Sequence, residues 1–176
     1  MNPVKKNILV TGLPGIGKTT LVKQLIYRIS QSRPVGFYTE EIRQEGERKG
    51  FQLVSLDGEK SILAHVFLDS HYHLGKYKVD VRGFDSFLDT IDFFSDPRRP
   101  VVIDEIGKME CLSSKFVRLI SELMDSPNTV IATIAHTDGG IKGRIKKRDD
   151  VALFKMNLDN RDTLVTDILD TLNVQP

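Results

Sequence analysis

The sequence predicts an α/β fold of three layers, in which a mostly parallel sheet carries an inserted antiparallel meander. Short apolar, strand-like runs alternate with stretches whose apolar residues recur at helical spacing, which is typical of a parallel sheet covered by helices. Between two of these units, consecutive strand-like runs are separated by turn residues, among them Asp57-Gly58, which indicates hairpins. A glycine-rich loop between the first strand and the first helix is the third indication.

Apolar periodicity and turn residues predict the elements in order. Strand character covers residues 7–11, 35–43, 51–56, 60–68, 77–81, 100–105, 129–135 and 151–156. Helical spacing of apolar residues covers 21–29, 84–94, 116–123 and 164–172. Ser113 or Ser114 is the expected cap of the third helix. In a sheet of this kind, ligands are expected at the carboxyl ends of the parallel strands.

Length and composition indicate one compact domain, residues 1–176. Hydrophobic residues make up 40% and charged residues 28%, and the net charge of +1 gives no drive toward nucleic acid or anionic membranes. The single Cys111 excludes an internal disulfide, and with the four histidines it shows no zinc-ligand spacing. Residues 1–6 are polar and the next apolar run is too short for a signal peptide or a membrane span, so we expect a cytoplasmic protein.

One stretch matches the phosphate-binding loop pattern G-x-x-x-x-G-K-[ST], also called Walker A, at every fixed position. In such a loop, backbone N–H groups wrap a phosphate and the helix N-terminus adds positive potential. Lys18 is expected to reach the terminal phosphates, and the Thr19 hydroxyl to bind Mg²⁺. The predicted nucleotide-binding residues are Gly12, Leu13, Pro14, Gly15, Ile16, Gly17, Lys18, Thr19 and Thr20.

A second element of a phosphate site is the apolar run that ends in two carboxylates, Asp104 and Glu105, as expected of a Walker B strand. Asp104 is expected to hold Mg²⁺ through water. Glu105, one position further, is placed to polarise a water in line with the γ-phosphate, which favours hydrolysis over transfer to another acceptor. The alternative is a solvated Glu105 that faces away from the metal.

Four blocks occur in this order: Phe37-Tyr38-Thr39-Glu40-Glu41-Ile42-Arg43, Arg48-Lys49-Gly50-Phe51, Tyr77-Lys78-Val79-Asp80 and Asp104-Glu105-Ile106-Gly107-Lys108-Met109-Glu110. With Lys147-Arg148-Asp149-Asp150-Val151 and Asn160-Arg161, they resemble the small P-loop nucleoside-triphosphatase family of thermophiles and archaea, which is related to the cancer-related nucleoside triphosphatase of animals. The likeness runs from the first strand to the last helix. It implies an α/β protein that hydrolyses nucleoside triphosphates with little base preference. Cys111 departs from the pattern, which favours a larger apolar residue there.

The resemblance also directs attention to polar residues at strand ends. One of Thr39, Glu40 and Glu41 is expected to help place magnesium or water; alternatively, the two acids simply face solvent. His136 closes the strand after Walker B, either as a sensor of the γ-phosphate or as a surface histidine.

Three further polar residues lie in loops. Lys108 and Glu110 either act at the site or pair with each other and cap the following helix. Asn160 either caps the last helix or lies near the base.

A basic segment contains Lys142, Arg144, Lys146, Lys147 and Arg148. It is either a solvated helix face or a lid that supplies, in cis, the cation that spreads transition-state charge. We expect Arg148, inside the matched block, to be that cation, with Arg144 as second choice. Lys146, at the outer edge of the run, is expected to matter much less.

The sequence therefore predicts a Mg²⁺-dependent hydrolase that converts ATP, GTP, CTP and UTP to diphosphate and phosphate, slowly and with broad base specificity. The expected catalytic residues are Lys18, Glu105 and Arg148, and the expected metal ligands are Thr19 and Asp104. A small-molecule or nucleotide kinase and a nucleotide-gated binding switch are the open alternatives. A monomer is favoured, and no membrane or nucleic-acid partner is indicated.

Overall fold

The computed structural model describes residues 5–173, so both ends of the predicted 1–176 domain lie outside the described residues. The strands are β1 Asn7–Thr11, β2 Val35–Gln44, β3 Glu47–Ser55, β4 Lys60–His65, β5 His73–Leu74, β6 Tyr77–Val79, β7 Val101–Ile106, β8 Val130–Ile134 and β9 Val151–Lys155. The helices are α1 Lys18–Arg28, α2 Val81–Asp89, α3 Ser114–Asp125, α4 Gly140–Lys146 and α5 Leu164–Asn173, with 3₁₀ turns η1 Ser30–Ser32 and η2 Glu110–Leu112.

Within these residues, the nine strands form one mixed sheet in the order β5-β6-β4-β3-β2-β7-β8-β1-β9. The five strands from β2 to β9 in this order pair in parallel, and β3, β4, β6 and β5 extend the sheet in antiparallel fashion. The predicted parallel sheet with an antiparallel meander is confirmed. β2 belongs to both parts, and β8 separates the phosphate-loop strand β1 from the Walker B strand β7.

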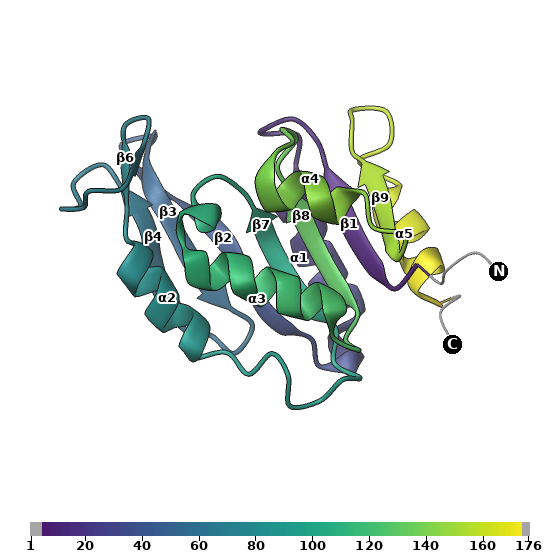
Figure 1. Cartoon of the computed structure of the whole chain (residues 1–176). Helices are drawn as coiled ribbons and strands as arrows, with labels where there is room; N and C mark the ends of the chain where they lie inside the picture. Colours follow the sequence, from purple (N-terminus) through teal and green to yellow (C-terminus); the bar gives the residue numbers. More distant parts are fainter. Residues whose placement is uncertain (1–4, 174–176) are drawn as a thin grey trace.

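Helices cover both faces of the sheet, which gives the predicted three layers (Figure 1). α2, α3 and α4 lie on one face, where the rings of Phe37, Phe84 and Phe116 pack together; the Phe37 and Phe84 centroids are 5.9 Å apart. α1 and α5 lie on the other face, where Leu21, Leu25 and other apolar residues pack against β1 and β8. Because both faces are covered, β1 and β8 are buried along their whole length.

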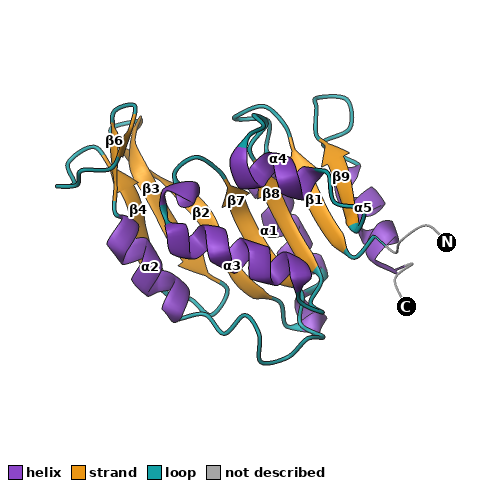
Figure 2. Cartoon of the chain, in the orientation of Figure 1, coloured by secondary structure: helices purple, strands orange, loops and turns teal. Residues whose placement is uncertain are grey.

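Residues of the matched blocks make contacts between strands of the antiparallel part. The Arg48 Nε donates to the Tyr77 hydroxyl at 2.9 Å, and the guanidinium lies over the ring of Phe51. A Cβ on Gly50 would lie 2.3 Å from the Ala64 carbonyl oxygen, so a side chain there would separate β3 from β4. Figure 2 shows this end of the sheet projecting beyond the helices, where the Arg48 and Tyr77 contact links β3 to β6 in addition to the backbone pairing of the strands.

The end of α2 differs from the prediction, and the start of α3 is now defined. α2 ends at Asp89 rather than 94: the Asp92 carboxylate accepts the Ser95 N–H in a new turn, and Phe94 is exposed. α3 is capped by Ser113, whose hydroxyl oxygen accepts the Phe116 N–H at 2.9 Å, which decides between the two candidate serines. Across residues 5–173, no helix combines the length and the apolar character that a membrane span needs.

Candidate nucleotide-binding site

The glycine-rich loop joins the carboxyl end of β1 to the first turn of α1. Gly15 and Gly17 have φ of 77° and 112°, a left-handed backbone that glycine adopts most easily. Gly17 is the N-cap of α1 and has no side chain, so the first N–H groups of the helix stay open to an anion. The Lys18 Nζ lies back over the loop and donates to the carbonyl oxygens of Gly12 at 3.0 Å and Leu13 at 3.2 Å.

A buried carboxylate, Asp104, stands at the carboxyl end of β7, and three hydroxyl groups donate to it. Thr19 at the start of α1 reaches Oδ2 at 2.8 Å, and Thr39 of β2 reaches the same oxygen at 3.3 Å. Thr133 of β8 reaches Oδ1 at 2.7 Å. Asp104 is only 1% exposed, so these donors replace the water that an ionised carboxylate requires.

The pair Thr19 and Asp104 suits magnesium. Their oxygens are 2.8 Å apart and lie beside the phosphate loop. Mg²⁺ usually takes one or two protein oxygens and completes its shell with water and substrate phosphates. The donor set therefore fits an ion that arrives with a nucleotide.

Thr133 was missed by the sequence prediction. It lies inside the apolar run 130–134, where a threonine is indistinguishable from any other β-branched strand residue. Its position could have indicated a role, because it lies one residue before the end of the strand, at the edge of the sheet where parallel strands bind ligands.

Glu105 follows Asp104 and is half-buried at the same edge. Burial raises the pKa of its carboxyl group, and the negative charge of Asp104 adds to this, while the cations Lys18 and Lys142 act in the opposite direction. The carboxyl group is therefore within electrostatic reach of the phosphate-loop lysine. A carboxylate with a raised pKa is a stronger base than one in water.

The two acids of β2 do not join Thr39 at the site. Glu40 pairs with Lys23 at 2.8 Å, and Glu41 pairs with Arg48 at 2.9 Å. Lys23 lowers the pKa of Glu40 and Arg48 lowers that of Glu41, which keeps both ionised on the strand surface. Of the three β2 candidates, only the hydroxyl of Thr39 reaches Asp104.

Arg148 lies away from the phosphate loop, so its position gives no support to the catalytic role expected for it. Its guanidinium pairs with Asp150 at 2.8 Å and with Asp125 at 2.7 Å. Asp150 also accepts from Asn7, the first residue of β1, whereas the phosphate loop follows the last residue of that strand. At about 3.3 Å per residue, the two ends of β1 are roughly 13 Å apart. The matched block instead ties α3 to the entry of β9.

Lys146, at the outer edge of the basic segment in the sequence, is fixed by several contacts in the structure. Its side chain is only 9% exposed, and Nζ contacts the carbonyl oxygens of Ala135 and His136 and the Asp138 carboxylate. It therefore holds the loop that leads from β8 into α4. Arg144 is exposed on α4, and Lys142 is the member of the basic segment that acts on Glu105.

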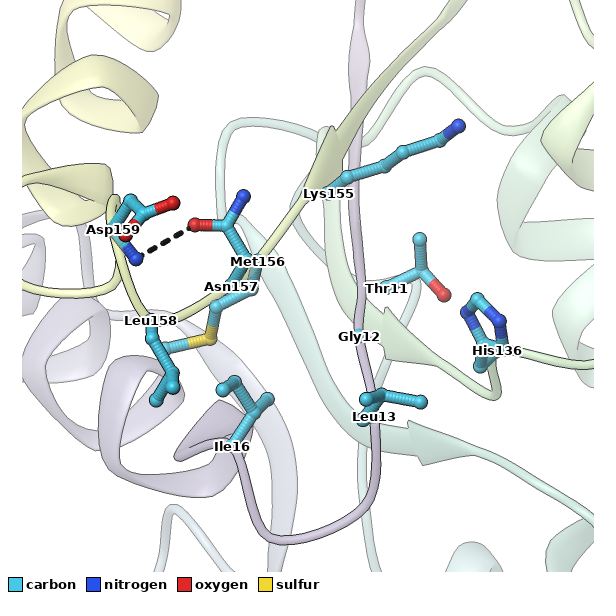
Figure 3. A pocket seen from close by; sticks show the side chains of 10 residues that line it. All are labelled: Thr11, Gly12, Leu13, Ile16, His136, Lys155, Met156, Asn157, Leu158 and Asp159. Atoms are coloured by element: carbon cyan, nitrogen blue, oxygen red, sulfur yellow. Dashed lines mark hydrogen bonds between the residues drawn. The ribbon is translucent and has the colours of Figure 1, made fainter.

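A hollow of about 410 Å³ opens beside the phosphate loop. Figure 3 shows Leu13, Thr11 and His136 on one side and Ile16, Met156 and Leu158 on the other, with Lys155 above. The Thr11 hydroxyl is the one buried side-chain polar atom in the described part of the chain without a hydrogen-bond partner. A second hollow of about 260 Å³, lined by Thr20, Gln24 and Arg161 among others, adjoins the start of α1.

The loop that closes the first hollow is held by its own amide side chains. Asn157 accepts the N–H groups of Asp159 at 2.9 Å and Asn160 at 3.0 Å. Asn160 accepts the Asn157 N–H and donates to the Lys155 carbonyl oxygen. Asn160 therefore shapes this loop, and its backbone oxygen, not its side chain, accepts the Leu164 N–H at the start of α5.

In this structure a strand leads into an anion-binding loop and a helix, and a buried aspartate two strands away in the sheet contacts the threonine of that loop. This arrangement defines the class of P-loop nucleoside-triphosphate-binding proteins. Comparisons with known proteins agree with this class. A family model described as NTPase matches residues 7–169. The chain belongs to that family, the THEP1 nucleoside-triphosphatase family to which the human cancer-related nucleoside-triphosphatase is related.

The similarity extends over nearly the whole chain. The nucleoside-triphosphatase THEP1 of Thermotoga petrophila is 44% identical over 163 residues, which cover 92% of this chain and 90% of that protein. The human cancer-related nucleoside-triphosphatase is 37% identical over 180 residues, 93% of this chain and 95% of that protein. The crystal structure of THEP1 from Aquifex aeolicus superposes with a TM-score of 0.83 at 36% identity, covering 94% of this chain and 98% of that one. These matches confirm the resemblance seen in the sequence.

Proposed function

We propose that this chain is a nucleoside-triphosphatase that hydrolyses the bond between the β- and γ-phosphates, slowly and with magnesium. The observation that carries the proposal is Glu105, a half-buried carboxylate next to Asp104 in β7 and within electrostatic reach of the phosphate-loop Lys18. Membership of a nucleoside-triphosphatase family supports the same chemistry.

Different residues bind the phosphates, hold the metal and activate the water. Loop N–H groups and Lys18 bind the phosphates, and Thr19 and Asp104 hold the metal. Glu105 takes a proton from a water whose oxygen forms the new bond to the γ-phosphorus, while the bond from that phosphorus to the bridging oxygen breaks and the diphosphate leaves. When bound, Mg²⁺ neutralises charge that develops on the phosphate oxygens.

We propose that Lys142, in place of Arg148, is the cation of this chain that stabilises the charge of the transition state. Lys142 comes from α4, at the carboxyl end of the sheet, and its charge reaches Glu105. A lysine gives one point charge and lacks the fork geometry of arginine. Enzymes of this type without a well-placed arginine turn over at about 10⁻³–10⁻⁴ s⁻¹ and those with one in cis at about 10⁻² s⁻¹, and we propose a rate in this slow range.

Broad base specificity follows from the surroundings of the loop. The larger hollow offers Leu13, Ile16, Met156 and Leu158 as apolar contacts, and both ends of the Asn160 amide are occupied in shaping the loop. Apolar contact and stacking do not read base edges. We therefore propose ATP, GTP, CTP and UTP as substrates with rates within about tenfold, equivalent to about 1.4 kcal/mol.

Phosphate release from each of the four triphosphates, with Mg²⁺ and with excess chelator, tests the proposal. Glu105→Gln is expected to bind nucleotide normally and to lose about 10²–10⁴-fold in kcat, with Glu122→Gln on the exposed face of α3 as the matched control. Hydrolysis by Glu105→Gln at the wild-type rate would contradict the proposed function. Phosphate transfer to an added acceptor in preference to water would show a kinase.

A further inference from the structure

Glu110 is a buried acid that the hydrolysis scheme leaves without a role. It is the first residue of η2 and is 6% exposed. The sequence offered helix capping as one explanation, but the side chain that caps α3 belongs to Ser113. Burying a carboxyl group is costly, so its position requires another reason.

Its neighbour across Gly107 is Glu105. A Cβ on Gly107 would lie 2.7 Å from Oε2 of Glu110 and 3.5 Å from Cδ of Glu105. Both carboxyl groups therefore pack on the same side of Gly107, in space that any side chain at this position would fill. The glycine of the matched block D-E-I-G-K-M-E is what lets the two acids approach each other.

The charged groups that act on Glu110 itself are acidic, while the cation Lys142 of α4 acts on its neighbours Glu105 and Cys111. Asp104 and Glu105 face it from β7, and the thiol of Cys111 follows it in η2. On α2 and α3, Asp85 accepts a hydrogen bond from the Ser113 hydroxyl, and Lys115 pairs with Asp89. Burial, together with the charges of Glu105 and Asp104, raises the pKa of Glu110 to about 8, so the group is neutral at neutral pH.

We propose that Glu110 is a positioning residue for Glu105: its buried carboxyl group packs beside Gly107 and holds the Glu105 side chain toward the phosphate loop. The proposal rests on the function proposed above, in which Glu105 takes the proton of the attacking water. A neutral acid fills this space without adding a second negative charge beside Glu105. An anion there would repel Glu105 and the incoming triphosphate.

The test compares kcat for phosphate release in wild type, Glu110→Gln and Glu110→Ala from pH 6 to 9. Cys111→Ala, in the same turn, is the matched control for packing. Glu110→Gln keeps size and neutrality and should retain kcat at pH 7. Glu110→Ala frees Glu105, and since a misplacement of about 1 Å can cost about 100-fold, we expect kcat to fall about 10- to 100-fold at unchanged nucleotide affinity.

Two readouts separate positioning from a general structural role. Wild-type kcat should decline as the pH rises through about 8, and this decline should be absent in Glu110→Gln. In single-turnover measurements on a Glu105→Gln background, Glu110→Ala should cause no further loss, because its effect passes through Glu105.

An equal loss from Glu110→Ala with and without Glu105, or unchanged kcat in Glu110→Ala, would overturn the inference. If Glu110→Ala does not fold, the Glu110→Gln profile decides: a decline above pH 8 identical to that of wild type also overturns it. Failure of the proposed function is distinguishable, because there Glu105→Gln alone would hydrolyse at the wild-type rate.

Discussion

Thr19 and Asp104 lie 85 positions apart in the sequence and are joined by a hydrogen bond of 2.8 Å between the threonine hydroxyl and Oδ2 of the carboxylate. The bond connects the start of α1 to the end of β7 across the intervening strand β8. We propose that these two groups hold the magnesium ion that arrives with a triphosphate; their oxygens are already close together in the protein alone.

Lys18→Ala and Asp104→Asn should each reduce phosphate release by several orders of magnitude, because phosphoryl transfer depends on positioning and on charge neutralisation. The first removes the cation at the terminal phosphates, and the second weakens the magnesium site. Steady-state kinetics together with circular dichroism, to verify folding, would measure this. Near-normal hydrolysis by folded Lys18→Ala would contradict the assignment of the phosphate loop.

Thr133→Val should weaken magnesium binding or activity by about 10- to 100-fold, the usual effect of removing a group that orients a metal ligand. The valine keeps the volume but leaves Oδ1 of Asp104 without its donor at 2.7 Å. Thr133→Ser restores the hydroxyl and should recover most of the loss. Magnesium titrations of the nucleotide-bound protein measure the effect, and equal behaviour of valine and serine would show that the hydroxyl has no role.

Lys142→Ala should lower kcat by about 10-fold or more with little change in nucleotide affinity, as expected when a charge aimed at the transition state is removed. Lys147→Ala, an exposed neighbour in the same basic segment, is the matched control and should have no effect.

Arg148→Ala, in contrast to Lys142→Ala, should lower stability and leave kcat unchanged. It removes ion pairs to Asp125 and Asp150 that are partly exposed, so we expect a loss of about 1–2 kcal/mol in stability and an unchanged kcat. Thermal unfolding and kinetics on the same preparation decide this. A fall in kcat with an unchanged Tm would return Arg148 to the catalytic site.

Glu110→Gln should stabilise the protein increasingly as the pH rises from 5 to 8. The pKa of Glu110 is raised from 4.5 to about 8 in the folded state. Between these values the unfolded chain releases the proton and the folded chain keeps it. Wild-type stability therefore falls by about 1.4 kcal/mol per pH unit in this window from this group alone.

Tm measured at pH 5, 6, 7 and 8 checks this prediction. The difference between Glu110→Gln and wild type should widen with pH, whereas the exposed Glu122→Gln should track wild type throughout. A constant difference across the range would contradict a raised pKa at Glu110.

Features that depend on short stretches of chain were predictable from the sequence. The phosphate loop, the Asp57-Gly58 hairpin and a serine cap at residue 113 or 114 each require particular residues within a few positions, because backbone geometry and local hydrogen bonds set them. The order of the strands was not predicted. The alternating βα units did predict a parallel sheet that binds ligands at the carboxyl ends of its strands. The expected extension of α2 to residue 94 failed because apolar spacing alone does not reveal the Asp92 turn.

The amino-acid sequence by itself determined that this protein is a P-loop α/β protein with Lys18, Thr19 and Asp104 at one site. Only the tertiary structure decided which distant groups meet there. It brought Thr133 to Asp104 and Glu110 to Glu105, and it carried Arg148 to the opposite end of β1, into pairs with Asp125 and Asp150. The physical reason is that the sequence gives the type of each charged or hydroxyl side chain but not its partner or its burial. These depend on which strands lie side by side and on the end of the sheet from which each loop emerges.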